Sequence, residues 1–252
     1  MSFAVAADKY DRFMGRYSSP LAPLFADFAN VSGVQSVVDV GCGPGALTAE
    51  LVARLGAPAV TAVDPSEPFV AAIRERYPDV TARLAPAEDL PFEDASFDAA
   101  LAQLVVHFMN DPVAGLREMG RVTREGGVVA ASVWDHGGGH GPLSAYWEVV
   151  RERDPSAPDE SSFAGAREGH LAVLFEEAGL RDVEEFALSV SVEHRTFAEW
   201  WEPYTLGVGP AGAYAAGLDP ESRAELRERC RARLPEPPFV IESRAWSARG
   251  LA

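Results

Sequence analysis

The chain has 252 residues, of which 47% are apolar, and 38 acidic against 22 Lys and Arg side chains give it a formal net charge of −16. This length and apolar content suffice for one large α/β domain with its own core. The negative charge disfavours nucleic acid and anionic membrane surfaces as partners, because both attract basic protein faces.

The two cysteines, Cys42 and Cys230, have no metal-binding, redox or disulfide-framework spacing. We therefore expect no metal, and a reducing, cytoplasmic setting. Residues 2–7 are mildly apolar but include no long apolar core before a cleavage site, so no secretion signal is predicted. No apolar run has the length of a membrane span.

The first predicted helix runs from Ser18 or Ser19, as a cap, to about Ala29, with Pro20 in its first turn. It follows a polar and aromatic stretch at 8–18. Beyond it, strands are predicted at 36–40, 59–63 and 80–84, and helices at 46–55 and about 66–76. The alternation β-α-β-α-β is typical of a parallel, doubly wound sheet, which binds ligands at the carboxyl ends of its strands.

The chain continues with a strand at 97–102, a helix at 112–122 and a strand at 128–134. His136 and His140 then lie in a glycine-rich loop, which favours a flexible loop over a metal site. Later helices are predicted at 143–153, 171–178 and 220–234, and strands at 183–192 and 239–248. An aromatic stripe at 196–205 and a Gly- and Ala-rich stretch at 207–217 lie between the strand at 183–192 and the helix at 220–234.

A glycine-rich turn follows the first strand. Gly41, Gly43 and Gly45 permit positive φ angles and close approach of a ligand to the backbone. The spacing also fits a dinucleotide fingerprint, and Asp64 follows at roughly the 20 residues typical of the ribose-binding acid. Asp39 is poorly placed for an anionic pyrophosphate but suits a ligand that carries an ammonium and a sulfonium group.

These landmarks carry a family resemblance. The run Val-Asp-Val-Gly-Cys-Gly-Pro-Gly at 38–45, with Ala-Val-Asp-Pro-Ser at 62–66, resembles class I S-adenosylmethionine-dependent methyltransferases. The stretches 87–92 and 96–98 resemble the next two landmarks of that family, and 10–18 resembles the lead-in of a small-molecule branch. The clear resemblance covers residues 8 to about 135.

The resemblance implies a Rossmann-like sheet of seven strands, mostly parallel, with an antiparallel last strand at the edge and helical cap insertions. We expect one domain over 1–252, with an N-terminal helical lid at 1–30 and cap segments at 136–170 and 196–237. It also implies S-adenosyl-L-methionine as cofactor, with S-adenosyl-L-homocysteine as product. The cofactor-binding residues expected from it are Tyr10, Arg16, Asp39, Gly41, Cys42, Gly43, Gly45, Asp64, Pro65, Ala87, Glu88 and Gln103.

For the methyl acceptor, His107 is expected to face the transfer site, where an imidazole could act as a base. The expected substrate pocket consists of His107, Trp134, Trp200, Trp201 and Tyr204. The helical spacing of the last three also fits packing of a cap against the core. As a pocket wall they would favour a flat or apolar acceptor, such as an aromatic or quinone-like compound.

The predicted function is methyl transfer to an O, N or C nucleophile of a small molecule, by a monomer or homodimer. Two alternatives remain: a non-catalytic protein that binds the same cofactor, and an NAD-dependent oxidoreductase. Asp39 and the Ala87-Glu88 landmark weigh against the oxidoreductase.

Overall fold

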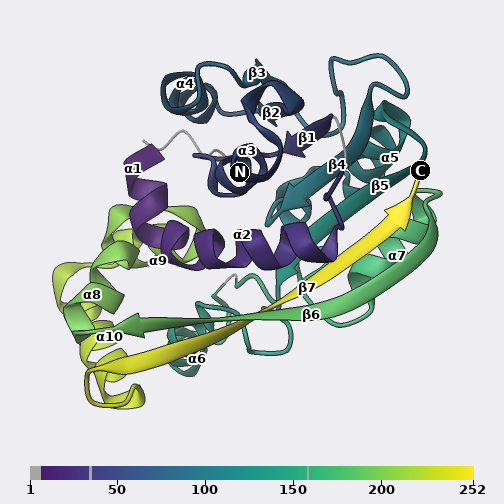
Figure 1. The fold of residues 1–252 in the computed structure, drawn as a ribbon. Coiled ribbons are helices and arrows are strands. Elements are labelled where there is room, and N and C mark those ends of the chain that lie inside the picture. Colours follow the sequence, from purple (N-terminus) through teal and green to yellow (C-terminus); the bar gives the residue numbers. More distant parts are fainter. Residues whose placement is uncertain (1–6, 34–35, 158) are drawn as a thin grey trace.

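The computed structural model describes residues 7–33, 36–157 and 159–252. Its centre is a seven-stranded sheet in the order β3-β2-β1-β4-β5-β7-β6 (Figure 1). The first five strands are parallel, and β7 is antiparallel to both of its neighbours. The strands are β1 (Val37–Val40), β2 (Val60–Asp64), β3 (Thr81–Leu84), β4 (Phe97–Gln103), β5 (Thr123–Trp134), β6 (Arg181–His194) and β7 (Phe239–Leu251).

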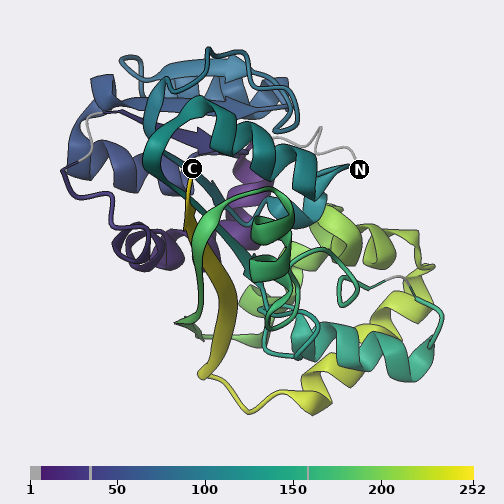
Figure 2. The same ribbon diagram turned by 90° about the vertical axis from the view of Figure 1, so that its right-hand side faces the viewer.

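Helices cover both faces of the sheet (Figures 1 and 2). The α-helices are α1 (Ala7–Tyr10), α2 (Arg16–Phe28), α3 (Ala46–Leu55), α4 (Glu67–Arg76), α5 (Pro112–Val122), α6 (Ser144–Arg153), α7 (His170–Glu177), α8 (Phe197–Trp201), α9 (Gly209–Gly217) and α10 (Pro220–Arg233). A π-helical turn at Asp11–Gly15 joins α1 to α2, and 3₁₀ turns occupy Ala57–Ala59, Val106–Phe108 and Glu202–Leu206.

The strand side chains alternate between two apolar layers, as the period of a β-strand requires. Val37 and Leu101 lie in a buried cluster with α2 and α3, which Ile73 of α4 joins. Val38 and Ala100 lie in a second cluster with α5 and α7. Every residue of β1 is buried, as expected for a central parallel strand.

The strands β6 and β7 form a long antiparallel pair that extends past the rest of the sheet. Pairing of β7 with β5 ends at Trp134↔Ala245, whereas pairing with β6 continues to His194↔Phe239. Helices α8, α9 and α10 lie at this projecting end (Figure 1). Their apolar side chains share one buried cluster with α6, Trp134 and the π-helical turn. The two predicted cap segments thus contribute to a single apolar layer.

The predicted fold class is confirmed, including the antiparallel last strand. Two expectations were wrong in detail. The last strand does not lie at the edge, because β6 pairs outside it. The first long helix begins at Arg16 without a Ser cap and contains both Pro20 and Pro23. The Gly- and Ala-rich stretch, for which no element was predicted, forms α9. Both prolines lie inside the helix, where neither can donate the backbone hydrogen bond of a regular helix.

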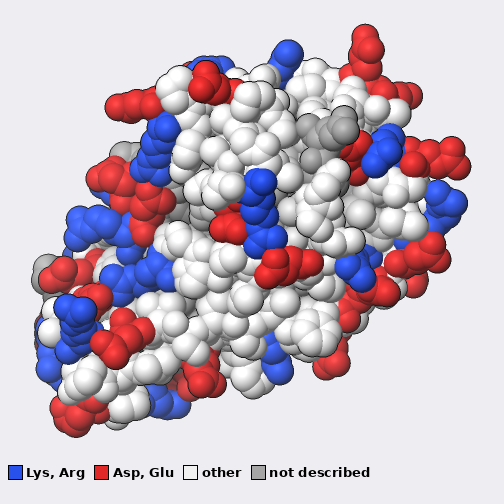
Figure 3. All heavy atoms as spheres, in the orientation of Figure 1, with Lys and Arg blue, Asp and Glu red and all other residues white. Residues whose placement is uncertain are grey.

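The structure describes only part of the N-terminal region for which expectations were stated. Residues 1–6, which include most of the 2–7 stretch and the start of the predicted lid, lie outside the described residues. Within the described ranges, no helix combines the length and apolarity that crossing a membrane would require. On the face seen in Figure 3, acidic and basic side chains are interspersed.

Helix α2 is part of the core, and neighbouring residues provide a matched test. Phe25 is fully buried against the sheet, whereas Leu24 is 39% exposed. We expect Phe25→Ala to lower the free energy of unfolding by about 3–5 kcal/mol, since it leaves a cavity in a packed core. Leu24→Ala should cost less than about 1 kcal/mol. Urea unfolding of both variants measures the difference, and equal effects would contradict this packing.

Candidate functional site

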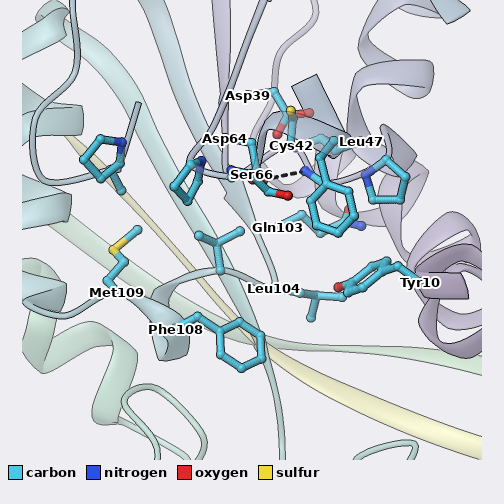
Figure 4. Close-up of a pocket in the computed structure, with 18 of the residues that line it drawn as sticks. Tyr10, Asp39, Cys42, Leu47, Asp64, Ser66, Gln103, Leu104, Phe108 and Met109 are labelled. Atoms are coloured by element: carbon cyan, nitrogen blue, oxygen red, sulfur yellow. Dashed lines mark hydrogen bonds between the residues drawn. The ribbon is translucent and has the colours of Figure 1, made fainter. Parts of the chain in front are cut away.

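A cavity of about 490 Å³ opens at the carboxyl ends of β1, β2 and β4. This is where parallel α/β sheets bind their ligands. Figure 4 shows Asp39, Cys42 and Asp64 on one side of the cavity, Phe108 and Met109 on the opposite side, and Tyr10 at the flank. Pro65 and Ala87 also line it.

The turn after β1 depends on its three glycines. Gly41, Gly43 and Gly45 have φ angles of 70°, 53° and 104°, in the left-handed region that favours glycine. A Cβ at Gly41 would lie 2.5 Å from Val105 Cγ1, whereas one at Gly43 would meet no atom within 4 Å. Gly43 lines the cavity, so a ligand can approach its backbone closely. Gly45 is not part of the lining and shapes the turn instead.

Asp64 connects the turn after β1 to the turn after β2. Its Oδ2 accepts a hydrogen bond from the Gly43 N–H at 2.9 Å, and its Oδ1 accepts one from the Ser66 N–H at 2.8 Å. Burial raises the pKa of the carboxyl to about 6, against the lowering effect of these two hydrogen bonds. Each oxygen retains a further lone pair, so Asp64 can also accept from the hydroxyls of a ligand.

Asp39 is a second buried carboxyl in the cavity wall, with 1% of its surface exposed. Its Oδ2 accepts a 2.6 Å hydrogen bond from the Thr48 hydroxyl at the start of α3. Burial, together with the charge of Asp64, raises the pKa of this carboxyl to about 7. A cation bound beside it would favour the ionised form and offset the cost of burying that charge.

The N–H groups of the glycine turn are already occupied. Those of Gly41 and Cys42 donate to Val63 O, that of Gly43 donates to Asp64, and that of Gly45 donates to Cys42 O. A pyrophosphate needs free N–H donors and no facing carboxylates. The turn therefore suits a ligand that brings its own hydrogen-bond donors.

Glu88 and Gln103 both line the cavity and also hold neighbouring segments in place. Glu88 Oε1 accepts from the N–H groups of Asn110 and Asp111. Gln103 Nε2 donates to Ser18 O, and its Oε1 is a buried acceptor with no partner among the described residues. A ligand in the cavity could therefore donate a hydrogen bond to Gln103 Oε1.

Two of the residues expected to bind the cofactor, Tyr10 and Arg16, lie in different places in the structure. Tyr10 lines the cavity, packs edge-on against Phe69 with ring centroids 5.5 Å apart, and has its pKa raised by burial. Arg16 is not in the lining. Its guanidinium lies 3.5 Å from Glu199 Oε1 and 2.9 Å from His194 Nδ1, which connects α2 to the cap.

A smaller cavity of about 30 Å³, here called the annex, adjoins the main one and shares Tyr10, Leu104 and Phe108 with it. The annex is lined by Tyr10, Phe13, Met14, Leu104, His107, Phe108, Trp134, His136, Leu143, Glu160, Val208, Gly209 and Pro210. Predicted residues His107 and Trp134 therefore lie in the annex and not in the main cavity. Burial, with a contribution from His136, holds the pKa of His107 well below its usual range, so its imidazole is neutral.

Trp200, Trp201 and Tyr204, the expected substrate wall, do not reach either of the two cavities described above. All three are at most 5% exposed, belong to the cap cluster, and line neither cavity. Tyr204 stacks on Tyr146 with centroids 4.4 Å apart. The stripe packs the cap against the sheet, so it no longer supports a flat, quinone-like acceptor.

Several lining residues were missed by the sequence analysis. Leu104 directly follows β4, a position that could have indicated it, whereas Phe69 lies in the first turn of α4 and Met109 after a 3₁₀ turn. Glu160 lies in a polar segment with no pattern that would have singled it out.

The loop after β5 is held by an ion pair. Asp135 Oδ2 accepts from Arg244 Nη2 at 2.6 Å and lies 3.0 Å from His140 Nδ1. Among residues 7–33, 36–157 and 159–252, no group of three or more His, Cys, Asp or Glu side chains is arranged to hold a metal ion.

Comparison with known proteins agrees with this geometry. Residues 38–131 match the family model described as "Methyltransferase domain". An uncharacterized methyltransferase of Mycobacterium bovis is 36% identical over 135 residues, which cover 54% of this chain and 52% of that protein. A malonyl-[acyl-carrier protein] O-methyltransferase of Erwinia billingiae is 32% identical over 149 residues, or 59% and 58% of the two chains. The chain thus spans about half the length of the curated relatives it matches.

A solved structure described as a putative methyltransferase from an antibiotic biosynthesis pathway of Anabaena variabilis superposes with a TM-score of 0.61. The match covers 92% of this chain and 97% of that one, at 18% identity, and therefore supports the fold alone. The match at residues 38–131 and the two relatives thus agree with the resemblance of this chain to class I S-adenosylmethionine-dependent methyltransferases.

Proposed function

We propose that the protein transfers a methyl group from S-adenosylmethionine to a small molecule. The observation that carries this proposal is the pair of buried carboxyls, Asp39 and Asp64, at adjacent strand ends in one cavity wall. S-adenosylmethionine supplies a methyl group on a positively charged sulfur and also carries an ammonium and a ribose diol. The cavity wall offers acceptors for both kinds of donor.

Each residue has a role that follows from its position. Asp39 receives the ammonium group, and Asp64 accepts from the ribose hydroxyls while it holds the turn. Gly43 lets the ligand approach the backbone. Ala87 and Pro65 contribute apolar contacts, and Tyr10 covers the site from the N-terminal side. Because the sulfonium is already activated, the protein's main tasks are to align the acceptor and to exclude water.

The alternatives are less well supported. Binding of NAD would place an anionic pyrophosphate against two carboxyls and a turn whose N–H groups are occupied. A protein that only binds the cofactor needs no space for a second ligand. Here the annex adjoins the main cavity at Leu104 and Phe108 and could hold part of an acceptor. His107 remains a candidate base, and its neutral imidazole in the annex is able to accept a proton from an acceptor.

The first test removes the carboxyl that organises the turn. Asp64→Ala leaves the Gly43 and Ser66 N–H groups without their acceptor, so S-adenosylhomocysteine affinity should fall by at least about tenfold. Isothermal titration calorimetry measures the affinity, with the exposed Asp79→Ala as matched control. Tighter binding of NAD than of S-adenosylhomocysteine by the unmodified protein would refute the proposal.

The pH dependence of cofactor binding provides a second test. The raised pKa of Asp39, about 7, means that its carboxyl is protonated below neutrality, and an ammonium binds only the ionised form well. Affinity for S-adenosylhomocysteine should therefore rise between about pH 5.5 and pH 8.

Asp39→Asn isolates this contribution, because the amide oxygen can still accept from Thr48. The variant should bind more weakly at pH 8 and lose the part of the pH dependence near pH 7. The remaining change, near pH 6, belongs to Asp64. An unchanged pH profile in Asp39→Asn would show that this carboxyl does not contact the ligand.

A further inference from the structure

The two cavities share an unusual charge pattern. Of the described residues that line them, none is Lys or Arg. Five carboxylic acids line them, namely Asp39, Asp64, Glu67, Glu88 and Glu160. A carboxylate or phosphate on the acceptor would therefore meet repulsion with no compensating cation.

Glu160 stands out because it is buried in the annex, with 4% of its surface exposed. Its Oε2 accepts one hydrogen bond, at 2.9 Å, from the Trp147 indole N–H. No ion pair of Glu160 is found among the described residues. A buried carboxylate without a cation is costly, and a positively charged ligand group would relieve that cost.

The rest of the annex suits a cation as well. Burial lowers the pKa of both His107 and His136, so both imidazoles are neutral and offer acceptor lone pairs. His107 Nδ1 is a buried atom without a hydrogen-bond partner among the described residues. Aromatic rings of Phe13, Phe108 and Trp134 also line the annex, and such rings attract cations through their π faces.

The annex is also small. At about 30 Å³ it holds a group the size of one or two water molecules, which matches an amino headgroup rather than a whole substrate. The body of the ligand would lie in the main cavity beside Tyr10, Leu104 and Phe108, which both cavities share.

We propose that the annex binds a protonated amino group of the methyl acceptor, with Glu160 as the residue that selects it. This inference rests on the proposed methyltransferase function and names its acceptor as an amine-bearing small molecule. It separates this chain from a relative such as the malonyl-[acyl-carrier protein] O-methyltransferase, whose name denotes an acidic acyl acceptor.

The test compares ligands that share the same hydrocarbon part, here called the body, and differ only in their polar headgroup. Calorimetry with protein saturated with S-adenosylhomocysteine measures binding of 2-phenylethylamine, 2-phenylethanol and phenylacetate, and of the same three headgroups on hexyl and cyclohexyl bodies. The amine should bind at least about tenfold more tightly than the alcohol on at least one body, and the carboxylate should not bind. Equal binding of amine and alcohol, preference for the carboxylate, or no binding by any amine would overturn the inference.

Variants then assign the selectivity to one side chain. Glu160→Gln keeps an acceptor for Trp147 but removes the charge, so amine affinity should fall about tenfold or more while alcohol affinity stays unchanged. Glu168→Gln, at an exposed position outside both cavities, is the charge-matched control and should leave both unchanged.

Cofactor affinity separates the two proposals. Failure to bind S-adenosylhomocysteine would refute the proposed function, whereas cofactor binding without amine selectivity would refute only this inference. If Glu160→Gln loses cofactor binding through misfolding, the headgroup preference of the unmodified protein decides.

Discussion

The site depends on a single carboxylate that joins two turns. Asp64, the last residue of β2, accepts from Gly43 in the turn after β1 and from Ser66 in the turn before α4. Parallel neighbours such as β1 and β2 have no tight hairpin between them to fix the relative position of their ends. The hydrogen bond from the Gly43 N–H to Asp64 adds to that constraint, beside those that the Gly41 and Cys42 N–H groups donate to Val63 O. The cavity wall is therefore defined by local backbone geometry.

The fold of residues 36–134 could be predicted because short sequence patterns specify it. The turn chemistry of residues 37–48 and the alternation of strands and helices through 36–134 specify the arrangement within short windows. The position of β7 between β5 and β6 could not be predicted from pattern alone, since periodicity identifies a strand but not its neighbours. The start of α2 was missed because the stretch 8–18 has no clear helical pattern and Pro20 was placed in the first turn of the helix.

The same distinction explains the errors at the site. The helical spacing of Trp200, Trp201 and Tyr204 correctly indicated one buried face, but spacing does not say what covers that face. Arg16 has the charge expected for a cofactor carboxylate, yet it pairs with Glu199, which is distant in sequence and lies next to this aromatic stripe. The burial of Glu160 could not be predicted from the sequence, because it depends on elements that are far apart in the chain.

The main cavity and the annex differ in how many of their lining residues fall in the range that matches the family model. Residues 38–131, which match the family model, contain Asp39, Asp64 and most of the residues that line the main cavity. Of the described residues that line the annex, only Leu104, His107 and Phe108 fall in that range. The others come from the π-helical turn and its flank, the end of β5, the loops around α6 and the start of α9. Because these segments lie outside the range that matches the family model, the nature of the acceptor is better argued from the charge of the annex itself than from the acceptors of related proteins.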